Sequence, residues 1–224
     1  MKSLTFWFDP ISPFAYLAFE QLPQVLQGVS YEVRYRPVLF AGLLGHWGQK
    51  GPAEIEPKRA WTFLHVLWLA RQRGIPMQMP AMHPFNPLAL LRLAVACAPA
   101  VGTSGRGTSA SGTPSRLVCE RILRHVWQGG LDPQDPQRLA ELTSSLAPPR
   151  DPQGADVKQQ LRDATDEAIA LGLFGVPTIT AGDKLFWGVD SLEMLAQCLR
   201  GDPMFDAGDW ATAGQSRPGV HRPA

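Results

Sequence analysis

The sequence is poor in the residues that build disulfide frameworks and metal sites. Its 224 residues include five histidines and only three cysteines, which are Cys97, Cys119 and Cys198. The cysteines are far apart and no C-x-x-C occurs, so neither a disulfide framework, a redox-active pair nor a zinc-type spacing is indicated. An odd number of widely spaced cysteines favours reduced thiols. We therefore expect a cytoplasmic protein without a metal ion.

An excess of charge and long apolar runs are also missing. Lys and Arg number 21 against 20 Asp and Glu, a formal net charge of +1, which gives no electrostatic case for a nucleic-acid partner. No apolar run reaches the roughly 18 residues of a membrane span, and the apolar stretch 4–8 is too short for a signal peptide. Hydrophobic residues make up 45% of the chain, which is enough for a sizeable core. These features predict a soluble, folded protein.

The first forty residues predict a β-α-β unit. Residues 4–8 are aromatic and apolar, as in a buried strand, and residues 31–38 alternate enough to be a second one. Between them an apolar helical pattern begins at Pro13 and ends before Gly28, with Ser12 in the capping position. Such a unit normally has parallel strands joined by a right-handed crossover.

The middle of the chain is predicted to be helical. Helices are expected over residues 58–73, 88–98, 117–127, 136–146 and 156–171. Frequent Gly and Pro indicate irregular segments over 40–57 and 77–87. Residues 99–115 are rich in Gly, Ser and Thr and predict a mobile loop.

The last part of the chain predicts a hairpin followed by a helix. Strands are expected over 178–181 and 184–187, around the turn Gly182-Asp183, and a helix over 191–199. The order of elements predicts an α/β fold, a thioredoxin-like domain with an inserted all-helical domain. Its boundaries are predicted at 1–40 and 155–200 for the split thioredoxin-like domain, 41–154 for the insert and 201–224 for a C-terminal tail.

Ser12 is the first candidate for chemistry. It follows a strand and opens a helix, so its hydroxyl lies where backbone N–H groups point outward. Such a helix terminus favours an anion and lowers the pKa of a thiol. The alternative is that Ser12 only caps the helix, since serine is a preferred capping residue.

Val176-Pro177 is the second candidate. The proline opens the third predicted strand after a long helix, where thioredoxin-like folds hold a cis bond. The peptide groups of Val176 would then face Ser12 and could pair with an extended peptide by strand addition. A peptide with its backbone on Val176 and its sulfur at Ser12 would most simply be glutathione. The alternative is a trans proline at the start of an edge strand.

Three motifs in order resemble one family. They are Phe8-Asp9-x-x-Ser12-Pro13-Phe14-Ala15-Tyr16-Leu17-Ala18, Phe174-Gly175-Val176-Pro177-Thr178 and Phe186-Trp187-Gly188-x-Asp190. They resemble the 2-hydroxychromene-2-carboxylate isomerases, which belong with kappa-class glutathione transferases and DsbA-type disulfide oxidoreductases. The resemblance covers most of residues 2–98 and 155–200. It implies a thioredoxin-like domain interrupted by helices, bound glutathione as cofactor and a homodimer.

The resemblance also implies a set of site residues. Ser12 is the expected catalytic residue. The residues expected to bind glutathione are Ser12, Val176, Pro177, Trp187, Gly188, Val189 and Asp190. Asp190 would receive the γ-glutamyl ammonium group. The structural alternatives are core packing for Trp187 and a plain helix cap for Asp190.

The expected reaction is a glutathione-dependent cis–trans isomerisation of an aromatic 2-oxo acid. Ser12 would donate a hydrogen bond to the glutathione thiolate, which adds to an electron-poor C=C bond, permits rotation and leaves. The candidates for a cation that holds the substrate carboxylate are Lys50, Lys58, Arg59 and Arg71. The substrate wall is expected from Pro52, Ala53, Phe85 and Asn86, with Trp47, Trp61 and Phe63 as further aromatic candidates.

Other functions stay open. Residues 51–54 lack the polar group common in the family, and His65 and Trp68 replace charged residues, so a kappa-like glutathione transferase or a non-catalytic binder of glutathione or peptides are alternatives. Thiol–disulfide exchange is disfavoured, because Ser12-Pro13-Phe14-Ala15 stands where that chemistry requires C-x-x-C.

Overall fold

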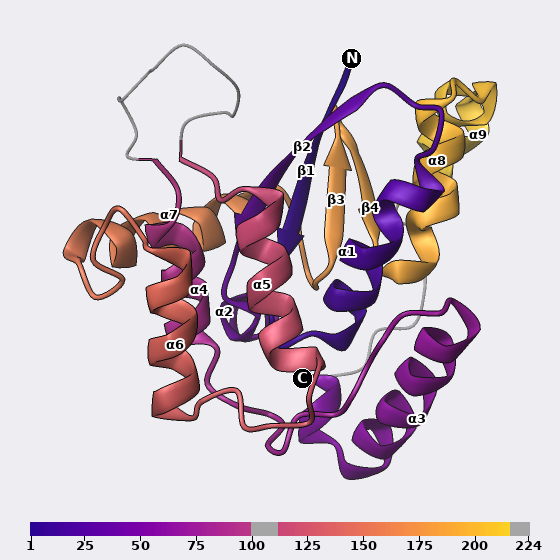
Figure 1. Ribbon diagram of the computed structural model, residues 1–224. Helices are drawn as coiled ribbons and strands as arrows, with labels where there is room; N and C mark the ends of the chain where they lie inside the picture. Colours follow the sequence, from indigo (N-terminus) through magenta and orange to yellow (C-terminus); the bar gives the residue numbers. More distant parts are fainter. Residues whose placement is uncertain (100–111, 216–224) are drawn as a thin grey trace.

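A four-stranded mixed sheet forms the centre of the protein. The structure, a computed structural model, describes residues 1–99 and 112–215. The strands are β1 (Lys2–Phe8), β2 (Tyr31–Pro37), β3 (Thr178–Ala181) and β4 (Lys184–Trp187), in the order β2-β1-β3-β4 (Figure 1). β1 pairs with β2 in parallel, and β3 is antiparallel to both β1 and β4. The strands predicted from sequence are confirmed, and the connection from β1 to β2 makes the expected β-α-β unit.

Helices cover both faces of the sheet, which is why β1 is apolar on both sides. Leu4, Phe6 and Phe8 point into the larger core, which they share with α1 (Pro13–Val25), α5 (Arg116–Trp127) and α8 (Leu192–Leu199). Trp7 points into a second core, together with α2 (Phe40–His46) and α7 (Ala155–Ala170). The apolar run of the first strand therefore reflects burial on two faces.

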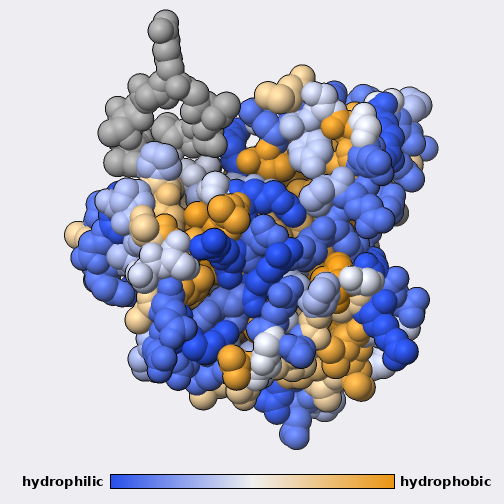
Figure 2. Space-filling model, in the orientation of Figure 1, coloured by the Kyte–Doolittle hydropathy of each residue, from blue (hydrophilic) through white to orange (hydrophobic). Residues whose placement is uncertain are grey.

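The remaining helices lie between β2 and α7 in the chain. They are the 3₁₀-helix η1 (Pro52–Glu54), α3 (Glu56–Gln72), α4 (Leu88–Ala96) and α6 (Pro136–Leu146). η1 packs against α3 and α3 against α1, while α4 packs on α7 and α5, and α6 on α5. α3 stands at the lower right of Figure 1, and Figure 2 shows apolar surface over the same region.

The irregular segment predicted over 40–57 is wrong, because it contains α2 and η1. Leu43 of α2 is fully buried in the second core. A Cβ atom at Gly42 would lie 3.0 Å from the Thr165 side chain of α7, so this glycine permits close helix packing. Gly42, one of the glycines that suggested a loop, is therefore a packing residue of a helix.

The tail predicted over 201–224 is partly wrong. Residues up to Gln215 include η3 (Pro203–Asp206) and α9 (Gly208–Ala213). Phe205 is buried in the main core, with its ring centroid 6.2 Å from that of Phe186 and 4.8 Å from that of Trp210. Most of the loop predicted over 99–115 and the end of the predicted tail lie outside the described residues.

The described part of the chain contains neither a membrane-spanning helix nor a cluster of metal ligands. Every helix in it falls short of the length and apolarity that a membrane crossing requires. Within the same residues, no group of three or more His, Cys, Asp or Glu side chains is arranged to hold a metal ion.

Candidate active site

Ser12 joins two segments that lie 164 positions apart in the chain. Its backbone is extended, and its Oγ accepts a hydrogen bond from Ala15 N–H at 3.2 Å, so it caps α1 as predicted. The same hydroxyl donates to the carbonyl oxygen of Val176 at 3.1 Å. The expected contact between Ser12 and Val176 is thus confirmed, and with 6% of its surface exposed Ser12 lies at the edge of the core.

Two backbone donors beside this contact have no partner. The Val176–Pro177 bond is cis, as predicted. Among the described residues, the N–H groups of Val176 and Phe14 donate no hydrogen bond. Pro13 has no N–H, so Phe14 carries the free donor of the first turn of α1. A hydroxyl and two free N–H groups suit an anion or a thiolate.

Asp9 lies beneath the loop that carries Ser12. Its carboxylate is fully buried and accepts hydrogen bonds from Ile11 N–H at 3.0 Å and Phe40 N–H at 2.9 Å. Its carbonyl accepts from Ser12 N–H at 3.0 Å. Burial raises the pKa of Asp9 to about 7, although the two N–H donors act in the opposite direction. Sequence reasoning quoted Asp9 in a motif but missed it as a site residue; its place at the end of a buried strand was the available signal.

Trp127 of α5 and His83, from the irregular segment between α3 and α4, hold the other side of this loop. The indole Nε1–H of buried Trp127 donates to Pro10 O at 2.9 Å. The imidazole Nε2 of His83 lies 2.9 Å from Ile11 O. The loop between β1 and α1 is thus bonded to the thioredoxin-like part through Asp9 and to the inserted helices through these two rings.

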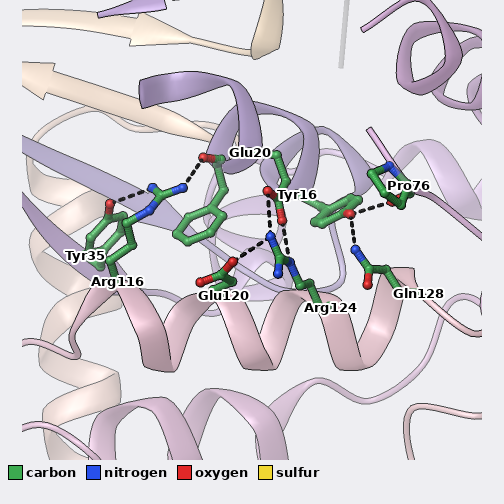
Figure 3. A network of polar contacts seen from close by, with 9 residues as sticks. Tyr16, Glu20, Tyr35, Pro76, Arg116, Glu120, Arg124 and Gln128 are labelled. Carbon is green, nitrogen blue, oxygen red and sulfur yellow. Dashed lines mark hydrogen bonds and ion pairs between the residues drawn. The ribbon is translucent and has the colours of Figure 1, made fainter. Parts of the chain in front are cut away.

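A polar seam holds α1 against α5 (Figure 3). Arg124 of α5 forms two hydrogen bonds with the Glu20 carboxylate, at 2.9 and 3.2 Å, and also an ion pair with Glu120. Gln128 donates to the Tyr16 hydroxyl at 2.9 Å, and this hydroxyl donates to Pro76 O. The seam fixes the direction of the helix that Ser12 opens.

Trp187, at the end of β4, is not a core residue. Half of its surface (51%) is exposed, and its ring centroid lies 4.8 Å from that of Phe174. A Cβ atom at Gly175 would lie 2.5 Å from the indole Nε1, so the ring needs a glycine beside it. Of the two interpretations of Trp187, the structure therefore excludes full core packing.

The turn after β4 is bonded to the proline turn. Gly188 N–H donates to Pro177 O at 2.9 Å, and Gly188 has a φ of +88°, which favours glycine. A Cβ atom there would lie 2.4 Å from Asp190 Oδ1. Val189 is buried in the main core. The hydrogen bond from Gly188 therefore fixes the segment 187–190 against the proline turn.

Asp190 is exposed and does not cap α8, the helix predicted over 191–199. α8 begins at Leu192 behind Ser191, which makes no side-chain capping bond. Among the described residues, the Asp190 carboxylate accepts no hydrogen bond. Partial burial lowers the pKa of Arg73 at the end of α3, while the charges of Asp190 and Glu193 oppose this shift. Arg73 is thus a cation near Asp190 that sequence reasoning missed, because α3 and α8 are far apart in the chain.

The residues predicted for the substrate wall have varied surroundings. Pro52 and Ala53 are half-buried in η1, which packs on α3. Phe85 is buried in the main core. Asn86 is exposed, and its Oδ1 accepts from Leu88 N–H at 3.0 Å. Phe85 and Asn86 therefore each have a structural contact of their own.

The predicted cations and further aromatic candidates also differ in exposure. Lys50, Lys58 and Arg71 are exposed, whereas Arg59 is half-buried and its charge acts on His83. Trp47 donates to Leu173 O at 2.8 Å, and the ring of Phe63 packs on that of His83. Trp61 is exposed on α3. Of the four predicted cations, Arg59 is therefore the one that is partly buried.

Comparison with known proteins places this geometry in a family. The DSBA-like thioredoxin domain matches residues 3–200. The chain belongs to the DSBA-like thioredoxin family. It is 27% identical over 208 residues to 2-hydroxychromene-2-carboxylate isomerase of Sphingobium xenophagum, covering 88% of this chain and 98% of the relative. It is 26% identical over 224 residues to glutathione S-transferase kappa 2 of Caenorhabditis elegans, covering 88% and 92%.

A solved structure agrees with this assignment. A 2-hydroxychromene-2-carboxylate isomerase superposes with a TM-score of 0.73 at 22% identity, covering 91% of this chain and 97% of the other. This similarity confirms the predicted thioredoxin-like fold with inserted helices.

The cysteines of this DSBA-like chain are not arranged for disulfide exchange. Ser12 and Ala15 occupy the ends of the four-residue segment that opens α1. All three cysteines are free. Burial raises the pKa of Cys97 to about 11 and that of Cys119 well above its usual value, so neither provides a reactive thiolate near neutral pH.

Asp9→Asn tests the buried carboxyl group. The native state holds the Asp9 proton up to pH about 7, whereas the unfolded chain releases it near 3.8. The stabilisation from this proton is complete below pH 3.8 and is lost as the pH rises to about 7. Between pH 5 and 8, we expect the free energy of unfolding of the wild type to fall by about 2–3 kcal/mol more than that of Asp9→Asn.

Urea titrations across this pH range provide the measurement. Asp9→Asn is expected to be less stable at low pH, since an amide has one acceptor oxygen for two N–H donors. Asp209→Asn, a change at an exposed position of α9, is the control and should keep the wild-type profile. Parallel profiles for wild type and Asp9→Asn would contradict the raised pKa.

Proposed function

We propose that this protein is a glutathione-dependent cis–trans isomerase of an aromatic 2-oxo acid of the 2-hydroxychromene-2-carboxylate type. The observation that carries the proposal is the buried contact of Ser12 Oγ with Val176 O beside two unpaired N–H groups. The names of the isomerase relatives supply the reaction class. Because the reduced glutathione pool is cytoplasmic, the proposal also locates the protein there.

The residues present fit glutathione. The free N–H of Val176 offers a backbone donor to a peptide, and Ser12 Oγ and Phe14 N–H offer donors to its sulfur. The Asp190 carboxylate accepts no hydrogen bond among the described residues and could receive an ammonium group. The Arg73 guanidinium lies near this carboxylate. The proposed binding residues are Ser12, Val176, Pro177, Trp187, Gly188, Val189 and Asp190. Val189 would act through its backbone, since its side chain is buried.

Ser12 acts in this proposal as a hydrogen-bond donor. When bound, glutathione would supply a thiolate that adds reversibly to the C=C bond of the substrate. The partners of the Ser12 hydroxyl are an N–H group and a carbonyl oxygen, and neither is a base that could activate it as a nucleophile. The Ser12 hydroxyl donates its proton to Val176 O and can rotate to donate to an anion instead, while the hydrogen bond from Ala15 N–H keeps the oxygen in place. The first turn of α1 adds its dipole to that of the hydroxyl.

The inserted helices complete the proposed substrate site. Arg59 is the cation proposed for the substrate carboxylate, because it is half-buried while Lys50, Lys58 and Arg71 are exposed. Pro52, Ala53, Phe85 and Asn86 remain the proposed wall. A kappa-like glutathione transferase is the second candidate, favoured by the kappa relative that aligns over 88% of this chain.

An assay with and without glutathione tests the proposal. With a hydroxybenzylidene-pyruvate substrate, we expect isomerisation that requires glutathione and returns it unconsumed, because a thiolate that adds must leave again. Absorbance reports turnover, and thiol titration reports glutathione. Consumption of glutathione in step with product would favour the transferase. Calorimetric binding without turnover would indicate a binder, and neither binding nor turnover would overturn the proposal.

Ser12→Ala tests the catalytic residue against a matched control. We expect turnover to fall about ten-fold or more, because the donor to the thiolate is lost. The lost cap lowers the free energy of unfolding by only about 1 kcal/mol. Ser115 caps α5 in the same way, accepting from Val118 N–H at 3.3 Å, so Ser115→Ala should lose similar stability and keep its rate. An unchanged rate in Ser12→Ala would remove Ser12 from the mechanism.

A homodimer is part of the proposal. α3 exposes Trp61, Leu64 and Trp68 in one row. Figure 2 shows apolar surface at the lower right, over the region of α3. Trp61 lies three positions before Leu64 and Trp68 four positions after it, so Leu64 is near the middle of the row. A two-fold axis there would bring the first tryptophan of each copy against the second one of the other. Such an exposed apolar row is typical of an interface.

Sedimentation equilibrium tests this interface. We expect the wild type to sediment as a dimer and the variant Trp61→Lys/Trp68→Lys as a monomer, since buried unpaired lysines oppose association. Leu117→Lys is the control, because Leu117 is equally exposed but lies on α5. A monomeric wild type, or a dimer that survives both lysines, would contradict the proposed face.

A further inference from the structure

We propose that His83 is a positioning residue for the active loop, and that its neutral ring holds Ser12 in place by donating a hydrogen bond to Ile11 O. The contact between His83 and Ile11 O is a property of the protein without a ligand. The effect of this contact on turnover rests on the proposed function. His83 belongs to the irregular segment between α3 and α4, and no sequence motif connects it with Ser12.

The loop before Ser12 presents two successive carbonyl groups to the inserted helices. Trp127 Nε1 donates to Pro10 O, and His83 Nε2 lies at the same distance, 2.9 Å, from Ile11 O. Ile11 O belongs to the peptide group whose nitrogen is that of Ser12. The Ser12 N–H of this same peptide donates to Asp9 O. His83 and Asp9 thus hold the two ends of one peptide plane, and this plane directs the backbone into Ser12.

The hydrogen bond fixes the tautomer of His83. A carbonyl oxygen can only accept, so Nε2 carries the proton in this contact. Nδ1 of a neutral ring is then a bare acceptor, and it is buried with no partner among the described residues. The rings of Phe63, Phe85 and Trp127 surround the imidazole at centroid distances of 5.2–6.1 Å.

These surroundings keep the ring uncharged. Burial lowers the pKa of His83; the bond to Ile11 opposes this shift, and the charge of Arg59 adds to it. A buried acceptor without a partner is unfavourable for the free energy of folding. An apolar side chain at position 83 would therefore stabilise the core more than histidine does. What the imidazole contributes is a rigid neutral donor aimed at Ile11 O.

His125 provides a matched control within the chain. Its Nε2 lies 3.0 Å from Pro133 O, and burial lowers its pKa as well. This contact joins the end of α5 to the segment before α6 and does not involve the loop before Ser12. A variant at His125 loses the same kind of bond, so it reports the general cost of such a loss.

The variants test the donor. His83→Leu removes it, whereas the amide nitrogen of His83→Gln can take the place of Nε2. In His83→Leu we expect kcat to fall about ten-fold and the exchange of the Ser12 and Ala15 amide protons to accelerate by a similar factor. His83→Gln should restore most of both, and His125→Leu should resemble the wild type in both. Equal behaviour of His83→Leu and His83→Gln would overturn the proposal, as would wild-type values in His83→Leu.

A measurement on the unaltered protein keeps the proposal falsifiable if His83→Leu does not fold. Long-range ¹H–¹⁵N spectra at neutral pH should show His83 protonated at Nε2 alone. A ring protonated at Nδ1 alone or at both nitrogens would overturn the proposal. If the wild type neither binds glutathione nor isomerises its substrate, the proposed function fails. The tautomer and the amide exchange then still decide the role of His83.

Discussion

The constraint on which the site depends is the short loop from Asp9 to Ser12. It must place a hydroxyl against Val176 O while every buried polar group of the loop finds a partner. Asp9 satisfies two N–H groups with its carboxylate and one with its carbonyl. Trp127 and His83 satisfy the carbonyls of Pro10 and Ile11. The geometry of Ser12 is therefore determined jointly by the sheet, α2 and the inserted helices.

This arrangement connects the inserted helical part to the candidate site. Trp127 of α5 and His83 before α4 contact the loop between β1 and α1 from its outer side. The seam between α1 and α5 has the same effect on the helix that follows Ser12.

The chemistry of the family is redirected here by small changes. Serine at the helix terminus offers a hydrogen-bond donor but no sulfur that could form a disulfide, and the three cysteines are free, with burial raising the pKa of each thiol. In the proposed function, the thiolate therefore comes from a ligand. Glycines at 175 and 188 leave room for Trp187 and Asp190 beside the proline turn. In the proposed function, a thiol peptide therefore binds between the terminus of α1 and the turn after β4.

The strands, the main helices and the contact of Ser12 with Val176 could be predicted from the amino-acid sequence. These follow from local periodicity, from capping residues and from the order of elements, which act within a few residues or within a known topology. Only the tertiary structure decided that Gly42 packs a helix against α7, that Phe205 is buried, and that Asp9, His83 and Arg73 surround the site. These depend on neighbours far away in the chain. Burial and partners of a polar side chain are properties of the whole packing, and no local pattern of residues encodes them.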